Sequence, residues 1–424
     1  MYADNLNVSV RDFLVRHLLD ADLFDREEQL SRFLSEMETV RKGGSGSVKM
    51  IPTWIRFPGE IPEPVSVTAI DVGGTNVRST VVTMDRQGIR NLDPLPVFPT
   101  PGIGEALSTG EFFRRIVSGV QSHLYTEKIC ICFSLANIPQ KDGDAVVAAG
   151  AKQVNVPDLV GQRVGQCFRE AAASLGLPSD QQITVINDTV AAALGGWSEN
   201  QAGGCKGFIG FIYGTGTNIA YPEPTGELIN IESGAYCGFP TGDIDDRYDA
   251  TLIDAGNDRF EKMVSGGYQG GLMTCILQTA VEEKLLSRSF AERLFASGEA
   301  APLTASDISA FSVDPFGCSR IASACENDRE REILCTVFDA VTRRSALLCS
   351  ITLTGALLRS CIGRSPSAPV FITAEGSTYR KQKGFQEQLE RYLAEAGEKY
   401  SLFYVLQHVP DAVLKGTAIA ALSE

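Results

Sequence analysis

Histidine, tryptophan and basic residues are scarce in this chain of 424 residues, and each scarcity narrows the possible function. The three histidines, His17, His123 and His408, give little support to a histidine-based mechanism. The 52 acidic residues outnumber the 38 basic ones, and the net charge of -14 argues against a nucleic-acid partner, because phosphate backbones bind basic surfaces. A nucleotide is still permitted, since its phosphates can bind locally.

The sequence also lacks the cysteine spacings of metal sites and hydrophobic runs long enough to span a membrane. The eleven cysteines are scattered, no CxxC occurs, and no second pair completes a zinc spacing with Cys130 and Cys132. We interpret them as reduced thiols, which favours a reducing cytoplasm. The weakly polar run at 345–358 is too short to cross a bilayer, and the first residues lack the pattern of a signal peptide. We therefore expect no membrane partner.

The remaining composition is typical of a globular protein long enough for two domains, with 44% apolar and 21% charged residues. Strand and helix patterns alternate from residue 65 to 188, which predicts a central sheet covered by helices. Within this part, residues 159–175 are predicted to be helical, with Asp158 as the N-cap. Further on, we expect glycine-rich hairpins, an acidic loop at 243–246, and mainly helices from 258 to 364.

One stretch, DVGGTNVR at 71–78, separates two β-prone runs and predicts a hairpin. Gly73 and Gly74 lack a Cβ, so their backbone N–H groups can approach a phosphate closely. Asp71 offers a carboxylate to a metal or its waters, and Arg78 can bind phosphate oxygens. No helix follows, so this is neither a P-loop nor a Rossmann fingerprint. An ordinary hairpin turn explains the same residues as well.

Three later stretches favour a ligand site. Residues 183–189, ITVINDT, read as a strand that delivers Asp188 and then begins a helix. Residues 207–218 and 370–377 each read as a strand that runs into a turn of small residues. The tripeptide GTN occurs at 74–76 and again at 216–218, which suggests two related halves that face one ligand.

These motifs, in this order, resemble the hexokinase family within the actin-like ATPase and sugar-kinase superfamily. The stretches 71–78, 186–189 and 213–218 are similar to LDLGGTNFR, VNDTV and GTGTN of that family. The stretches 230–236, 260–266, 374–377 and 415–418 are similar to NTEWGAF, FEKMISG, the adenosine turn DGS and KGAAL. Residues 33–38 and 48–53 resemble its EME and VKMLPT segments, so the resemblance covers nearly the whole chain.

The resemblance implies an α/β, two-lobed actin-like ATPase (ribonuclease H-like) fold with a central cleft. The small lobe would comprise residues 67–187 plus 411–424, and the large lobe residues 1–66 plus 188–410. The implied reaction transfers a phosphoryl group from ATP, with Mg²⁺, to the 6-hydroxyl of a hexose, glucose by default. One motif set in a chain of this length implies one active site.

Family roles carry over residue by residue. Asp188 would be the general base, although a carboxylate that stabilises a helix N-terminus is the simpler reading of that residue alone. The catalytic set would be Asp188, Lys152 and Arg78. The sugar would be bound by Ser134, Lys152, Asn187, Asp188, Asn218, Glu232 and Glu261. ATP would be bound by Asp71, Gly73, Gly74, Thr75, Asn76, Arg78, Thr215, Gly216, Thr217, Gly376 and Ser377. Asp71 and Asp188 would hold Mg²⁺ through water.

Departures from the family pattern border the sugar. Leu135 and Ala136 stand in the sugar loop, Ala151 precedes Lys152, and Ser233 replaces a tryptophan beside Glu232. A kinase for mannose, fructose or an amino sugar therefore remains open, as does a hexose sensor without turnover. An actin-like or chaperone ATPase would share the phosphate hairpins. Intact Asp71, Arg78 and Asp188 argue against the sensor, and the sugar-binding pattern argues against the ATPase.

Overall fold

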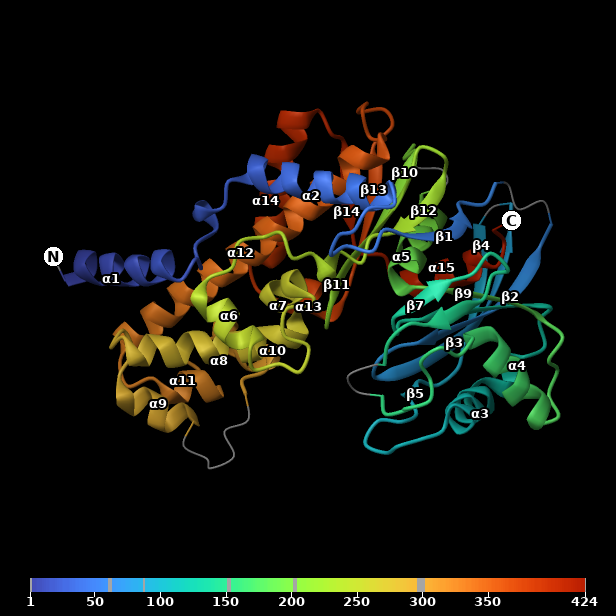
Figure 1. Cartoon of the computed structure of the whole chain (residues 1–424), viewed down its shortest axis with the longest axis horizontal. Coiled ribbons are helices and arrows are strands. Elements are labelled where there is room, and N and C mark those ends of the chain that lie inside the picture. The colour runs from blue at the N-terminus through green and yellow to red at the C-terminus, as the bar shows by residue number, and fades with distance from the viewer. Residues whose placement is uncertain are drawn as a thin grey trace.

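A computed structural model describes residues 2–59, 63–86, 88–150, 154–200, 204–295 and 302–423, with the backbone alone at 2–8 and 91. Its strands form two large mixed sheets and a small hairpin, β7–β8 (Figure 1). The first, which we call the β2 sheet, has the order β4-β3-β2-β6-β9, with β5 paired to β3. The second, the β10 sheet, has the order β1-β12-β11-β10-β13-β14.

The two large sheets share one arrangement of strands. In each, a glycine turn joins two antiparallel strands, β2–β3 or β10–β11, and a parallel strand, β6 or β13, lies beside the first of them. This arrangement agrees with the two related halves that the repeated GTN tripeptide predicts. The strands are β1 Ile51–Arg56, β2 Val65–Val72, β3 Asn76–Asp85, β4 Gly88–Pro94, β5 Phe98–Pro99, β6 Lys128–Phe133, β7 Asn137–Pro139, β8 Ala145–Val147, β9 Gln182–Ile186, β10 Gly207–Tyr213, β11 Thr217–Pro222, β12 Glu227–Asn230, β13 Val370–Glu375 and β14 Tyr404–Gln407.

Helices cover both sheets, and a group of them packs at the side of the β10 sheet away from the β2 sheet (Figure 1). The long helix α12 runs through that group and also packs on the β10 sheet. The helices are α1 Tyr2–Arg16, α2 Arg26–Arg41, α3 Thr109–Val120, α4 Val164–Ser174, α5 Asp188–Glu199, α6 Asp243–Asp249, α7 Arg259–Val264, α8 Gly266–Glu282, α9 Arg288–Phe295, α10 Ala305–Val313, α11 Arg320–Ala324, α12 Asp328–Ser360, α13 Ser377–Lys381, α14 Phe385–Tyr400 and α15 Ala412–Ala420. Short 3-10 turns lie at Ala21–Leu23, Gln121–His123 and Ser233–Ala235. No helix of the described ranges is long and apolar enough to cross a membrane.

Helices α5 and α15 pack against each other between the two sheets. Glycine permits this close approach, because a Cβ at Gly416 would collide with the carbonyl oxygen of Ala191 on α5. In the same way, a Cβ at Gly210 of β10 would collide with the carbonyl oxygen of Thr189. The first turn of α5, which carries Asp188, is therefore fixed against the β10 sheet, while α15 packs on β2 and β6.

Two sequence predictions are wrong. Helix α4 begins only at Val164, and Asp158 instead accepts a hydrogen bond from the backbone N–H of Thr109 (3.0 Å), at the start of α3. The acidic stretch at 243–246 is not a loop but the start of α6. Its Asp245 points inward to a fully buried Arg344 of α12, with both guanidinium Nη atoms 2.8–2.9 Å from the carboxylate oxygens.

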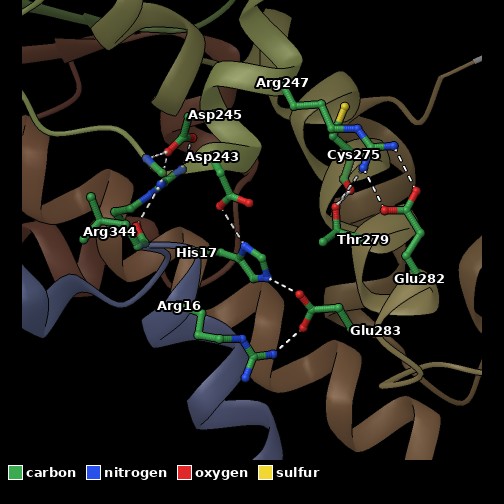
Figure 2. A network of polar contacts seen from close by, with 12 residues as sticks. Arg16, His17, Asp243, Asp245, Arg247, Cys275, Thr279, Glu282, Glu283 and Arg344 are labelled. Atoms are coloured by element: carbon green, nitrogen blue, oxygen red, sulfur yellow. Dashed lines mark hydrogen bonds and ion pairs between the residues drawn. The ribbon is translucent and has the colours of Figure 1, made fainter.

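A polar network extends from this buried ion pair to the end of α1. Figure 2 shows His17 between Asp243 of α6 and Glu283, which follows α8. The His17 Nδ1 atom lies 2.8 Å from Asp243 Oδ1, and Nε2 lies 2.9 Å from Glu283 Oε1. His17 is only 5% exposed. Its side chain thus joins α1 to α6 and to the end of α8, a structural role.

Candidate active site

Hydrogen bonds hold the Gly73–Asn76 turn of the β2 sheet in place, and the tip of the turn is open. The backbone N–H of Gly73 donates to the carbonyl oxygen of Asn76 (3.0 Å), and Thr100 Oγ1 donates to that of Gly73 (2.7 Å). A Cβ at Gly74 would meet no atom within 4 Å among the described residues. The geometry suits the predicted approach of a phosphate to Gly73 and Gly74 and leaves room for it.

The second glycine turn, Gly214 to Thr217, lies against the third. Gly376 adopts φ of 125°, a conformation open to glycine, and a Cβ there would collide with the carbonyl oxygen of Tyr213. Thr378 Oγ1 donates to the carbonyl oxygen of Gly214 (2.9 Å). The predicted phosphate turn and the predicted adenosine turn, at the start of α13, are thus brought together.

Asp188 begins α5 at the carboxyl end of β9, and Asn187 is its N-cap, with Oδ1 accepting from the backbone N–H of Thr189 (2.9 Å). The pKa of Asp188 is raised to about 7, mainly by burial and in smaller part by the negative charges of Asp71 and Glu232. A hydrogen bond from Thr189 Oγ1 (3.0 Å) acts in the opposite direction. A carboxylate with this pKa can exchange protons near neutrality, which suits a general base.

Two more of the predicted residues, Asn218 and Glu232, meet where β11 begins and β12 ends. Asn230 Nδ2 donates to Glu232 Oε1 (2.7 Å), and Asn218 Nδ2 donates to Asn230 Oδ1 (2.7 Å). Glu232 has a left-handed backbone with φ of 53°. Burial raises its pKa, and the nearby charge of Asp258 adds to the effect. Sequence reasoning missed Asn230 and Asp258, although Asn230 opens one of the quoted motifs.

Glu261 reaches the same region from α7. Its Oε2 atom accepts the backbone N–H of Thr217 (3.1 Å). A Cβ at Gly216 would collide with Glu261 Oε2, and a Cβ at Gly234 would come within 2.9 Å of it. These two glycines therefore let one carboxylate lie between the second phosphate turn and the Glu232 loop.

Ser134 follows β6, and its backbone N–H donates to the carbonyl oxygen of Val72 (3.1 Å), the residue that follows Asp71. The buried Cys132 thiol lies close enough to Asp71 and Asp188 for their charges to add to the burial that raises its pKa. Ser134, Asp71 and Asp188 are thus neighbours at one end of the β2 sheet. Lys152, the remaining predicted catalytic and sugar-binding residue, and Ala151 lie outside the described residues.

The donor set fits a nucleotide-bound magnesium ion. The described residues contain no group of three or more histidine, cysteine, aspartate or glutamate side chains that could hold a metal. Mg²⁺ commonly uses one or two protein carboxylates and completes its shell with water and substrate phosphates. Asp71 and Asp188 provide such a pair, and Gly73 and Gly74 leave space for phosphates beside it.

Comparisons with known proteins agree with this geometry. Residues 208–423 and residues 20–196 match two family profiles, each described as hexokinase. Hexokinase-1 of Schizosaccharomyces pombe is 24% identical over 436 residues, which is 93% of this chain and 86% of that protein. Hexokinase-2 of Equus caballus is 26% identical over 397 residues, and the matched region is 85% of this chain but 42% of that relative. The chain thus spans less than half of that relative's length.

Solved structures show the same fold. A hexokinase from Schistosoma mansoni complexed with glucose superposes with a TM-score of 0.77 over 99% of both chains, at 22% identity. A ROK hexokinase from Thermus thermophilus gives a TM-score of 0.52 and 14% identity over 83% of this chain and 97% of that one. The two-lobed α/β architecture is therefore shared with sugar kinases.

Proposed function

Because the chain belongs to the hexokinase family, we propose that it transfers the γ-phosphoryl group of Mg-ATP to the 6-hydroxyl of a hexose, with glucose as the preferred acceptor. The observation that carries the proposal is Asp188 at the start of α5, with a pKa of about 7, beside charges from both sheets. A base with a pKa near 7 has a substantial deprotonated fraction at neutral pH, and that form can accept the hydroxyl proton.

The sugar would lie between the end of β9 and the Glu232 loop. Asn218, Glu232 and Glu261 provide hydrogen-bonding oxygens and amides for its hydroxyl groups. Asn187 Oδ1 is engaged by the backbone of α5, which leaves the amide nitrogen of this residue for the sugar. Ser134 would contact the sugar from the β2 sheet, and Lys152 would contact it and the transferring phosphoryl group.

The nucleotide would be held by the three glycine turns. Backbone N–H groups of Gly74, Thr75 and Asn76 would face phosphate from one side, and those of Thr215 and Gly216 from the other, with Gly73 and Thr217 shaping the two turns, because their own N–H groups are bonded to Asn76 and Glu261. Gly376 and Ser377 would flank adenosine. Bound Mg²⁺ would neutralise phosphate charge, with Asp71 and Asp188 holding its water ligands. Arg78, which binds Asp71, would add a positive charge beside the phosphates.

The proposed lobes are residues 67–187 plus 411–424 and residues 1–66 plus 188–410. What supports the proposal is that residues 67–187 contain β3, β4, β6, β9 and most of β2, which begins at Val65, whereas the strands of the β10 sheet fall in the second set; α5 and α15 lie between the two sheets. We place the reaction in a reducing cytoplasm, since all eleven cysteines are free.

ADP release with Mg-ATP, measured across a panel of glucose, mannose, fructose and glucosamine, tests the function. We expect sugar-dependent ADP release that is fastest with glucose. ATP hydrolysis that ignores the sugar would support an ATPase instead, and hexose binding without ADP release would support a sensor. Release that is fastest with another hexose would keep the kinase and overturn only glucose as the preferred acceptor.

A further inference from the structure

Glu36 on α2 gathers three hydrogen bonds from one short segment. Its Oε1 atom accepts the backbone N–H and the Oγ hydroxyl of Ser47, both at 2.6 Å, and the backbone N–H of Val48 at 3.0 Å. The chain passes close to this carboxylate, because a Cβ at Gly46 would come within 3.1 Å of Glu36 Oε1 and 2.5 Å of Val40 Cγ2. One carboxylate therefore fixes how the chain enters β1.

The segment 47–50 in turn holds both ends of the loop that carries Glu232. Before Glu232, the carbonyl oxygen of Ile231 accepts the backbone N–H groups of Lys49 (3.0 Å) and Met50 (3.2 Å). After it, the backbone N–H of Cys237 donates to Ser47 Oγ (2.9 Å). Ser47 Oγ is thus a bridge that donates to Glu36 and accepts from the loop.

Glu232 needs such support. Its left-handed backbone, with φ of 53°, is uncommon for a residue with a side chain and persists only when the surroundings enforce it. Met50 is also left-handed, with φ of 48°, at the point where the segment contacts Ile231. The strained backbone of Glu232 is therefore flanked by contacts that Glu36 organises.

We propose that Glu36 is a positioning residue for the sugar-binding carboxylate Glu232, acting through Ser47 and the backbone of 48–50. The inference rests on the proposed function, since it assumes that Glu232 binds the hexose. Its charge strengthens three hydrogen bonds at once, which neutral acceptors in that place would not do. The hydrogen bonds of Glu36 go to Ser47 and Val48 and not to Glu232, so its effect must pass through the segment.

The test is equilibrium hexose binding, by calorimetry and by the sugar-induced rise in melting temperature, followed by kinetics. Glu36→Gln keeps the shape and removes the charge, and Ser47→Ala removes the bridge. We expect each to weaken hexose binding and raise the sugar KM by roughly 5- to 20-fold, while kcat and the ATP KM stay within about twofold. Glu28→Gln is the control, because it removes an exposed carboxylate of the same helix that pairs with Arg32.

A double-mutant cycle separates positioning from a general loss of structure. If Glu36 acts through Glu232, Glu36→Gln adds little to the binding loss already caused by Glu232→Gln. Additive losses, or unchanged hexose binding in both Glu36→Gln and Ser47→Ala, would overturn the inference. Hexose binding without turnover in the unaltered protein would overturn the proposed function alone, since the cycle can still be completed from binding.

Discussion

Arg78 and Asp71 face each other directly across the β2–β3 hairpin, and both Arg78 Nε (3.0 Å) and Nη2 (2.5 Å) lie on one oxygen of Asp71. Asp71 is buried, with 6% of its surface exposed. Its negative charge also acts on Asp188, where it raises the pKa. Arg78 therefore offsets a charge that would otherwise make the proposed base harder to ionise.

The first prediction concerns this pair and the glycine turn beside it. Arg78→Ala should raise the ATP KM and lower kcat, because a positive charge beside the phosphates is lost, and should leave hexose binding largely intact. Gly74→Val should do the same, because its side chain would enter the open space at the turn. Steady-state kinetics with varied ATP, beside hexose binding, give both readouts.

Arg90→Ala is the control, since it removes an arginine paired with Asp85 elsewhere on the same sheet. Normal ATP affinity in Gly74→Val would mean that the hairpin is not a phosphate turn, and the reading as an ordinary hairpin would stand.

The second prediction concerns Asp188. Asp188→Ala should lower kcat by ~10²–10⁴-fold, because general-base catalysis acts on a proton that moves in the transition state. Hexose binding should weaken much less. Asp180→Ala, at an exposed position before the other end of β9, should keep the activity. A variant that retained most of the original kcat would remove Asp188 from the role of base.

The third prediction is a pH dependence. With a pKa of about 7, Asp188 should give an acid limb on which kcat/KM falls tenfold per pH unit below about pH 7. In the unfolded chain an aspartate titrates near 3.9, so between about pH 4 and 7 the folded protein binds more protons than the unfolded one. The contribution of this group to stability is therefore present at low pH and lost as pH rises through about 7.

Asp188→Asn removes both effects. Its melting temperature should exceed that of the unaltered protein at pH 8 by more than it does at pH 5. Melting curves at the two pH values measure this difference. A difference that shrinks as pH rises would have the wrong sign for a raised pKa.

The fourth prediction concerns the buried pair between Arg344 and Asp245 (Figure 2). Arg344→Met should lower the free energy of unfolding by ~3–5 kcal/mol, because it leaves a buried carboxylate without its partner. Arg343→Met, next to it on α12, removes a partly exposed pair with Asp22 and should cost at most about 1 kcal/mol. Denaturant unfolding measures both, and equal losses would contradict the assignment.

The local patterns in the sequence predicted the parts of the site that lie within single motifs. The two glycine hairpins and the strand-to-helix step at Asp188 are confirmed, because hydrophobic periodicity and turn residues act over a few neighbours. The sequence analysis was wrong where contacts with distant residues contribute to the local structure. The acidic residues at 243–246 resemble a loop, but they form the first turn of α6, where Asp245 accepts the backbone N–H of Gly242 and also pairs with the buried Arg344, almost a hundred residues away.

The same limit applies to β1 and to Glu36. The sequence analysis predicted no strand at 51–56, yet these residues form β1 and pair with β12 in the β10 sheet. Glu36 contacts Ser47, and the segment that begins at Ser47 contacts both ends of the Glu232 loop. The second of these contacts joins parts of the chain almost two hundred residues apart. No short-range pattern contains this information, because it depends on how the sheets assemble.

The last prediction concerns motion between the two sheets. Ser134 and Asp71 belong to the β2 sheet and its loops, whereas Glu232 and Glu261 come from the β10 side. A hexose that contacts both sides binds better to a closed arrangement and shifts the population toward it. Closure would exclude water from the phosphoryl group, so ATP hydrolysis without sugar should be much slower than sugar phosphorylation.

Scattering and fluorescence can follow this closure. Lys141, in the turn between β7 and β8, lies over the ring of Trp54 on β1. Its Nζ atom is 5.1 Å from the ring centroid. The contact links the β10 sheet to a hairpin that follows the β2 sheet strand β6, so closure should alter Trp54 emission as well as shrink the radius of gyration. Trp54→Phe leaves Trp197 as the remaining tryptophan and should lose the fluorescence change but keep the scattering change. If saturating hexose altered neither signal, and ATP hydrolysis were equally fast without sugar, the two sides would not close on the substrate.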